Sequence, residues 1–253
     1  MRPFSFHKLG FLLLSFVLLI VCVIVVELVM IKRGGIPVAV PDIPRRPEAY
    51  GTGQPLTYVV MGDSTTVSQG GDYDQGIARS TARVLARNHT VTLHNFGISG
   101  ARAGDVRTEQ LPKAVTVRPD VVLLAVTAND VTHFTSLGSI RRDLEAILEE
   151  LRRVNPEVQI VLTGAPQMGS IPRFPEPLKS LARHRTAQIN EIISDLDQPD
   201  YIHFARIAEE TGPAFLANPD LFAQDRFHPT KEGYELWNRV LEKSFVDVSS
   251  RLK

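Results

Sequence analysis

The sequence predicts an α/β fold in which helices cover both faces of a parallel sheet. Short runs rich in β-branched residues alternate along the chain with longer segments of helical apolar periodicity. Such alternation is typical of strands joined by crossover helices, a connection that makes neighbouring strands parallel. The chain has 253 residues, of which 43% are hydrophobic, enough for one well-buried domain but not for two large ones.

An apolar segment at residues 9–31 predicts one transmembrane helix ahead of this domain. The segment is longer than a signal-peptide core, and no small-x-small cleavage site follows it, so we expect an uncleaved single-pass anchor over residues 1–32. Positive charges flank both of its ends and leave the orientation in the membrane open, with an extracytoplasmic domain favoured. The only cysteine, Cys22, lies in this segment, which excludes an intrachain disulfide.

Residues 33–55 are rich in proline and glycine and show no hydrophobic periodicity. This composition predicts an extended tether between the anchor and the folded domain. The domain itself is expected to occupy residues 56–253.

Within that domain, apolar runs that stop at turn-forming residues predict five strands, at residues 59–61, 91–96, 121–126, 159–163 and 201–204. The run at 121–126 is apolar throughout, which indicates a strand buried on both faces. Helical spacing of apolar residues predicts helices at 76–87, 140–154, 178–196 and from about Thr230 onward. Thr230 is a suitable N-cap for the last helix, whose expected buried residues are Tyr234, Trp237, Val240, Leu241 and Phe245. An irregular stretch is expected between the fifth strand and Asp225.

Four blocks of polar residues lie at the carboxyl end of a predicted strand or farther along the chain after it. The blocks are Gly62-Asp63-Ser64, Asn95 to Gly100, Asn129-Asp130, and Asp225 with His228. Because the carboxyl ends of parallel strands meet at one edge of a sheet, one pocket can collect all four blocks. Together they supply a nucleophile, a base, a group that orients the base, and donors for a developing oxyanion. These are the groups that acyl transfer to a hydroxyl requires.

In order and approximate spacing, the four blocks resemble those of the SGNH hydrolases, also called GDSL esterases. The resemblance runs from about Leu56 to the C-terminal helix. It implies a flavodoxin-like three-layer α/β/α sandwich around a parallel five-stranded sheet. Thr127 stands where the third block usually has glycine, so the loop that carries Asn129 is expected to differ in geometry.

The same resemblance implies roles for individual residues. Ser64 attacks the ester carbonyl, His228 takes its proton and returns it to the leaving alcohol, and Asp225 holds the imidazole. The oxyanion hole is implied to consist of the Ser64 and Gly100 amides and the Asn129 side chain. No cofactor and no metal are implied, because the triad supplies both nucleophile and base.

The expected function is that of a serine esterase or acylhydrolase, lysophospholipase-like or lipase-like, acting on a small-molecule ester such as a lipid or an acylated glycan. Two alternatives use the same triad: a deacetylase of O-acetylated carbohydrates, and an acyltransferase. A non-catalytic ligand-binding module is a third alternative, which a complete triad disfavours. The formal net charge is zero and no block of like charges occurs, so no nucleic-acid partner is expected.

Several residues near these blocks can be interpreted in two ways. Asp63 is either a catalytic acid or, as we favour, a brace for the turn around Ser64. Asp130 either orients the Asn129 loop or is a solvated turn carboxylate. The stretch 165–177 contains three such apolar residues, Met168, Ile171 and Phe174. They either contact an acyl chain or pack beneath a long loop.

Overall fold

A computed structural model of the chain describes residues 6–34, 36–198 and 200–252. Its sheet has six strands in the order β1-β3-β2-β4-β5-β6. Their bounds are β1 (Glu48–Tyr50), β2 (Gln54–Gly62), β3 (His89–Asn95), β4 (Val121–Ala125), β5 (Gln159–Leu162) and β6 (Ile202–Phe204). All five predicted strands are confirmed, and they pair in parallel. The prediction of a five-stranded sheet was wrong by one strand, because β1 adds to the edge of β3 in the antiparallel direction.

The predicted helices are confirmed as α2 (Ile77–Leu85), α6 (Leu137–Val154), α7 (Leu178–Leu196) and α9 (Lys231–Arg251). Further helical segments are α1 (Phe6–Gly34), α3 (Ala103–Asp105), η2 (Val106–Gln110), α4 (Leu111–Thr116), α5 (Ala128–Thr132) and α8 (Ile207–Ala217), with short η1 (Tyr73–Gln75), η3 (Met168–Ser170) and η4 (Pro219–Leu221). The stretch after the fifth predicted strand is therefore helical rather than irregular. The sequence does not predict α8, because Gly212 and Pro213 lie inside it and both residues disfavour a helix interior.

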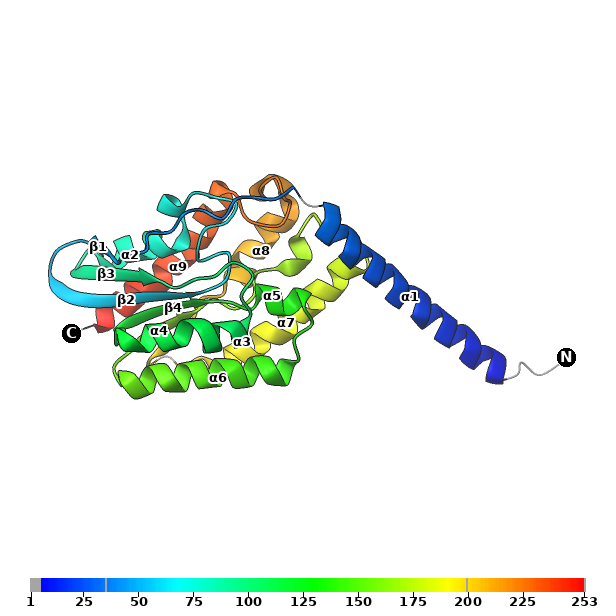
Figure 1. Cartoon of the computed structure of the whole chain (residues 1–253), viewed down its shortest axis with the longest axis horizontal. Coiled ribbons are helices and arrows are strands. Elements are labelled where there is room, and N and C mark those ends of the chain that lie inside the picture. The colour runs from blue at the N-terminus through cyan, green and yellow to red at the C-terminus, as the bar shows by residue number, and fades with distance from the viewer. Residues whose placement is uncertain (1–5, 35, 199, 253) are drawn as a thin grey trace.

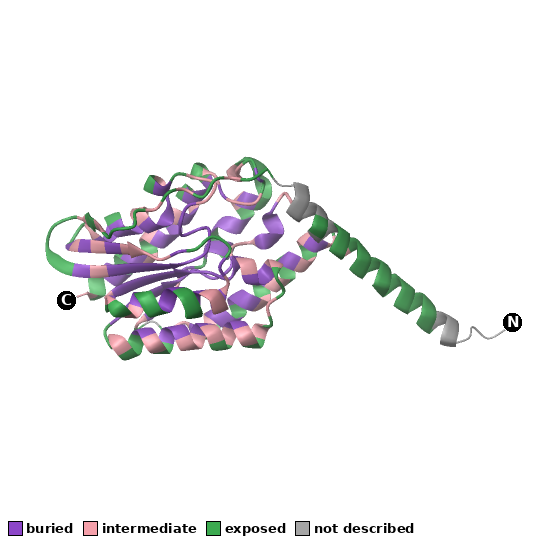
Figure 2. Ribbon diagram, viewed as in Figure 1, coloured by how far each residue is buried: buried purple, intermediate pink, exposed green. Residues whose placement is uncertain are grey.

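The fold has three layers, because the sheet lies between α2 and α9 on one face and α4, α6 and α7 on the other (Figure 1). Successive residues of β2 face opposite layers: Val59 and Met61 pack toward α6, while Tyr58 and Val60 pack toward α9. The central strands β2, β4 and β5 are buried along most of their length (Figure 2). With β1 set aside, the parallel strands lie in the order 2-1-3-4-5 along the chain, which is the flavodoxin-like order and places a ligand site at the carboxyl edge.

Helix α1 projects from the domain, and its described apolar side chains are largely exposed (Figures 1 and 2). Among the described residues, no helix is long and apolar enough to cross a bilayer, so the structure does not support the predicted anchor. Membrane localisation stays a prediction from the sequence.

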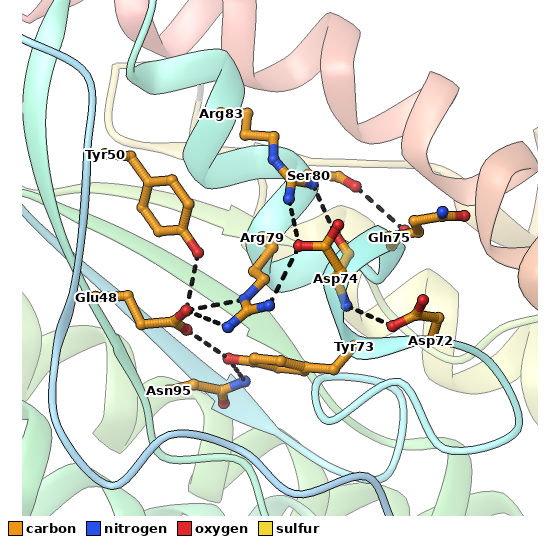
Figure 3. A network of polar contacts seen from close by, with 10 residues as sticks. All are labelled: Glu48, Tyr50, Asp72, Tyr73, Asp74, Gln75, Arg79, Ser80, Arg83 and Asn95. Carbon is orange, nitrogen blue, oxygen red and sulfur yellow. Dashed lines mark hydrogen bonds and ion pairs between the residues drawn. The ribbon is translucent and has the colours of Figure 1, made fainter.

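The end of the predicted tether is part of the domain rather than an extended spacer. Glu48 in β1 accepts hydrogen bonds from the Arg79 Nε (2.8 Å), the Tyr50 hydroxyl (3.0 Å) and the Tyr73 hydroxyl (3.2 Å) (Figure 3). Tyr73 in turn accepts from the Asn95 side chain at 3.3 Å. Composition alone misassigns this segment, because its strand pairing and its ion pair depend on partners more than 25 residues away.

Candidate active site

The turn that carries Ser64 begins where β2 ends, at Gly62. The φ angle of Gly62 is +149°, and a Cβ atom there would lie 1.9 Å from the carbonyl oxygen of Ala125. Only glycine fits this position. Asp63 then braces the turn, because its Oδ1 accepts from the Thr65 amide (3.0 Å) and the Thr65 hydroxyl (2.9 Å). The bracing interpretation of Asp63 is therefore the one that the geometry supports.

Burial raises the pKa of Asp63 to about 6, although the two hydrogen bonds from Thr65 oppose the rise. A carboxyl whose pKa is higher in the folded chain than its ordinary value of 3.8 binds more protons in the folded state between those values. The contribution of Asp63 to the free energy of unfolding therefore falls as the pH rises from about 4 to about 6.

We expect Asp63→Asn to gain stability relative to the wild type over that interval, because asparagine keeps the oxygen acceptor and does not ionise. Urea unfolding at pH 4, 5, 6 and 7 measures the difference in the free energy of unfolding. The control variant is Asp220→Asn, which removes a carboxylate that is exposed on the surface. A difference between Asp63→Asn and wild type that is the same at every pH would contradict the prediction.

Three predicted residues, Ser64, His228 and Asp225, form a continuous chain of hydrogen bonds. Ser64 Oγ lies 2.9 Å from His228 Nε2, and His228 Nδ1 lies 2.6 Å from Asp225 Oδ2. The other oxygen of Asp225 accepts from the amides of Phe227 and His228, both at 3.0 Å. Burial of Asp225 opposes its ionisation, but these hydrogen bonds outweigh burial and lower its pKa. Asp225 is thus a carboxylate that orients the imidazole.

The predicted oxyanion donors meet at the same edge of the sheet. The loop that carries Gly100 is held beside β2, because the Ile98 amide donates to the Gly62 carbonyl at 3.1 Å. Asn129 joins this loop through a hydrogen bond from its Nδ2 to the Ala101 carbonyl at 3.0 Å. Within the described part of the chain, no group accepts a hydrogen bond from the amides of Ser64 and Gly100. Two backbone donors are therefore free for a ligand oxygen.

Thr127 and Asp130 set the position of Asn129. Thr127 has a left-handed φ of +95°, a conformation that a β-branched residue adopts only under strain. Glycine adopts this φ without a steric penalty, so threonine is the strained choice at this position. Asp130 is fully buried, and its Oδ2 accepts from the Ala103 amide at 3.0 Å. It therefore fixes the Asn129 loop to α3 and is not a solvated turn carboxylate.

Gln110 is a residue of this site that the sequence analysis missed. Its side chain is fully buried, and it pairs with both backbone groups of Gly62: Oε1 accepts from the Gly62 amide and Nε2 donates to the Gly62 carbonyl, each at 2.8 Å. This pairing holds the end of β2 directly before the Ser64 turn. A glutamine in a helical segment has no sequence signal that separates such a clamp from a solvated side chain.

An apolar pocket opens beside Ser64, Asn129 and His228. It is enclosed by residues of the loop before α7 and of α8, α9 and the loop between them, namely Met168, Ile171, Phe215, Phe222, Phe227 and Trp237. Met168 and Ile171 thus line the pocket, as one of the two interpretations expects. Phe174 lies outside it and packs against Phe227, with ring centroids 6.0 Å apart.

Solved structures of other proteins share this fold at low sequence identity. The lipase Lip_vut3 from a goat rumen metagenome superposes with a TM-score of 0.61 at 19% identity, over 75% of this chain and 97% of that one. A family 3 carbohydrate esterase from Clostridium thermocellum gives a TM-score of 0.61 at 17% identity, over 78% and 98% of the two chains. These likenesses show that the chain shares the fold of both proteins.

Sequence comparison gives the family. The GDSL-like esterase Rv1075c of Mycobacterium tuberculosis is 27% identical over 120 residues, which is 47% of this chain and 37% of that protein. The match thus spans well under half of the length of that relative. The GDSL-like lipase/acylhydrolase family matches residues 60–236, a span that contains the Ser64 turn, Asn129, Asp225 and His228. The chain therefore belongs to the GDSL-like lipase/acylhydrolase family.

Proposed function

We propose that the protein hydrolyses carboxylic esters through an acyl-enzyme on Ser64. The observation that carries this proposal is the continuous hydrogen-bonded chain from Ser64 Oγ through the His228 imidazole to the Asp225 carboxylate. His228 Nε2 takes the Ser64 proton as Oγ attacks the ester carbonyl. The tetrahedral oxyanion receives hydrogen bonds from the Ser64 and Gly100 amides and from Asn129.

The second half of the reaction uses the same residues. After His228 has given the proton to the leaving alcohol, it takes a proton from water as the water attacks the acyl-enzyme, and it gives that proton to Ser64 Oγ as the acyl bond breaks. Asp225 keeps Nδ1 protonated, so that Nε2 is the basic nitrogen that faces Ser64, and it stabilises the imidazolium that forms. The products are a carboxylic acid and an alcohol, and Ser64 is restored.

A small acyl group fits the pocket better than a long one. The free volume beside Ser64 is about 30 Å³, which is room for two or three water molecules at about 10–15 Å³ each. A lysophospholipase-like or lipase-like enzyme with a long acyl chain needs a deeper pocket than this. The small volume also supports the second candidate function, removal of O-acetyl groups from a larger molecule. An acyltransferase would differ only in the acceptor that replaces water.

The proposal is tested on the full chain with p-nitrophenyl acetate, butyrate and octanoate and with a fluorophosphonate probe. We expect hydrolysis of the acetate, lower kcat/KM as the acyl chain lengthens, and covalent labelling of Ser64 located by mass spectrometry. Absence of turnover on all three esters, together with absence of the label, would contradict the proposal and favour the ligand-binding module instead.

A further inference from the structure

Two cavities meet at His228. The first is the pocket beside Ser64, and the second is a larger groove that extends from His228 toward α1 and α7. Among the described residues, Ser64 lines the first cavity but not the second, whereas His228 and Phe227 line both. Their rings lie edge to face with centroids 5.0 Å apart, and together they separate the two cavities.

The two cavities differ strongly in size. The groove has a free volume of about 460 Å³, against about 30 Å³ in the pocket beside Ser64. A volume of this size accommodates a chain of many heavy atoms, whereas the pocket accommodates only a few. Whatever part of an ester enters the groove can therefore be much larger than the part that enters the pocket.

The walls of the groove are mostly apolar. They come from α1, from α5 and the turn after it, from the loop before α7 and from α7 itself, and the main apolar residues are Val25, Val29, Val131, Phe134, Phe174 and Leu178. The polar side chains of the wall, apart from His228, are Thr132, His133 and Arg173. A polyol bound here would leave most of its hydroxyl groups without partners, which is costly. An apolar group would be buried at a gain.

Phe134 is the most exposed aromatic residue of this wall. Its side chain is 42% exposed, and its backbone has a left-handed φ of +51°. A bulky residue in that conformation is strained, and such strain is concentrated at sites of function. An apolar ligand in the groove would cover this ring.

The chemistry of ester cleavage assigns one part of the substrate to each cavity. During acylation the bond between the carbonyl carbon and the alkoxy oxygen breaks, and the acyl group is bonded to Ser64 Oγ. This bond holds the acyl carbon at Ser64, which lines the pocket and not the groove. The alkoxy oxygen takes a proton from His228 Nε2, so the alcohol leaves through the cavity that His228 lines without Ser64.

From this arrangement we infer that the preferred substrates are esters of a short carboxylic acid with a long apolar alcohol. The inference rests on the proposed function, since it assumes that Ser64 forms the acyl-enzyme. Water then releases the short acid from Ser64 and restores the free enzyme, while the apolar alcohol departs along the groove.

Isomeric esters test this inference without a change in overall hydrophobicity. Hexyl acetate and ethyl hexanoate have the same atomic composition and differ in which side of the ester carries the long chain. Initial rates on the full chain are measured by pH-stat titration, with ethyl acetate as the common short reference. We expect kcat/KM for hexyl acetate to exceed that for ethyl hexanoate by about tenfold or more, the usual scale for added methylenes in an apolar site. Equal values, or a preference for ethyl hexanoate, would overturn the inference while leaving ester hydrolysis in place.

Phe134→Ala locates the effect in the groove. This variant should lower the ratio of kcat/KM for hexyl acetate to kcat/KM for ethyl acetate by about three- to tenfold. Leu216→Ala is the matched control, because Leu216 is 49% exposed on α8 and lines neither cavity. If both variants change the ratio equally, the groove is not the site of the alcohol. If the wild type hydrolyses none of the three esters and the fluorophosphonate probe labels no serine, the proposed function fails and this inference fails with it.

Discussion

Replacement of Ser64 with alanine is expected to lower kcat for p-nitrophenyl acetate by a factor on the order of 10⁶. The reason is that Ser64 Oγ is the atom that would carry the acyl group, and it lies 2.9 Å from the base that activates it. His228→Ala removes that base and should cost a similar factor. Because the two residues act as one unit, the double variant should be no slower than either single variant.

Asp225→Asn should lower kcat by about 10⁴-fold, because an amide in place of the carboxylate favours the wrong imidazole tautomer. The control is Asp220→Asn, which removes an exposed carboxylate five residues earlier and should leave kcat unchanged. Circular dichroism of each variant establishes that the domain is folded. If folded Ser64→Ala retains more than about 1% of the wild-type kcat, the acyl-enzyme mechanism is contradicted.

Asn129→Ala is expected to lower kcat by about 10²- to 10³-fold with little change in KM. The asparagine amide would bind an oxygen that carries negative charge only in the transition state, so substrate affinity depends on it less. Steady-state kinetics with p-nitrophenyl acetate separates the two constants. A rise in KM at constant kcat would instead indicate that Asn129 binds the ground-state ester.

This variant also removes a hydrogen bond that supports the loop, since Asn129 Nδ2 donates to the Ala101 carbonyl. Asn155→Ala is the matched control, because Asn155 Nδ2 makes a similar bond to the Pro119 carbonyl, at 2.9 Å, at the other end of the sheet. Asn129→Ala should lose about 1 kcal/mol of stability, and Asn155→Ala at least as much, because Asn155 Oδ1 also accepts from the Glu157 amide at 3.1 Å. Only Asn129→Ala should lose kcat.

The parallel strands could be predicted because their signal is local. A run such as 121–126 is apolar at every position, which identifies a strand buried on both faces without knowledge of its neighbours. The edge strand β1 carries no such signal. Its three residues form a strand only because β3 presents a free edge and because Arg79 binds Glu48, and neither partner is close in the sequence.

That the candidate site residues lie together could be predicted for a related reason. Ser64, Asn129 and Asp225 with His228 follow strands or the last loop before α9, and a parallel sheet brings the carboxyl ends of its strands to one edge. Their support could not be predicted in the same way. Gln110 clamps Gly62 from 48 positions away, and a sequence pattern does not distinguish a buried glutamine from an exposed one.

The sequence by itself determined the α/β architecture, the order of the four blocks and the residues that meet at the carboxyl edge of the sheet. Periodicity and turn chemistry depend on residues that are close in the sequence, so these features can be predicted from the sequence alone. Only the tertiary structure decided that Asp130 is buried, that β1 completes the sheet, and that a small pocket and a large groove lie on either side of His228. Burial and cavity shape depend on side chains from many elements at once, and those contacts exist only after the chain has folded.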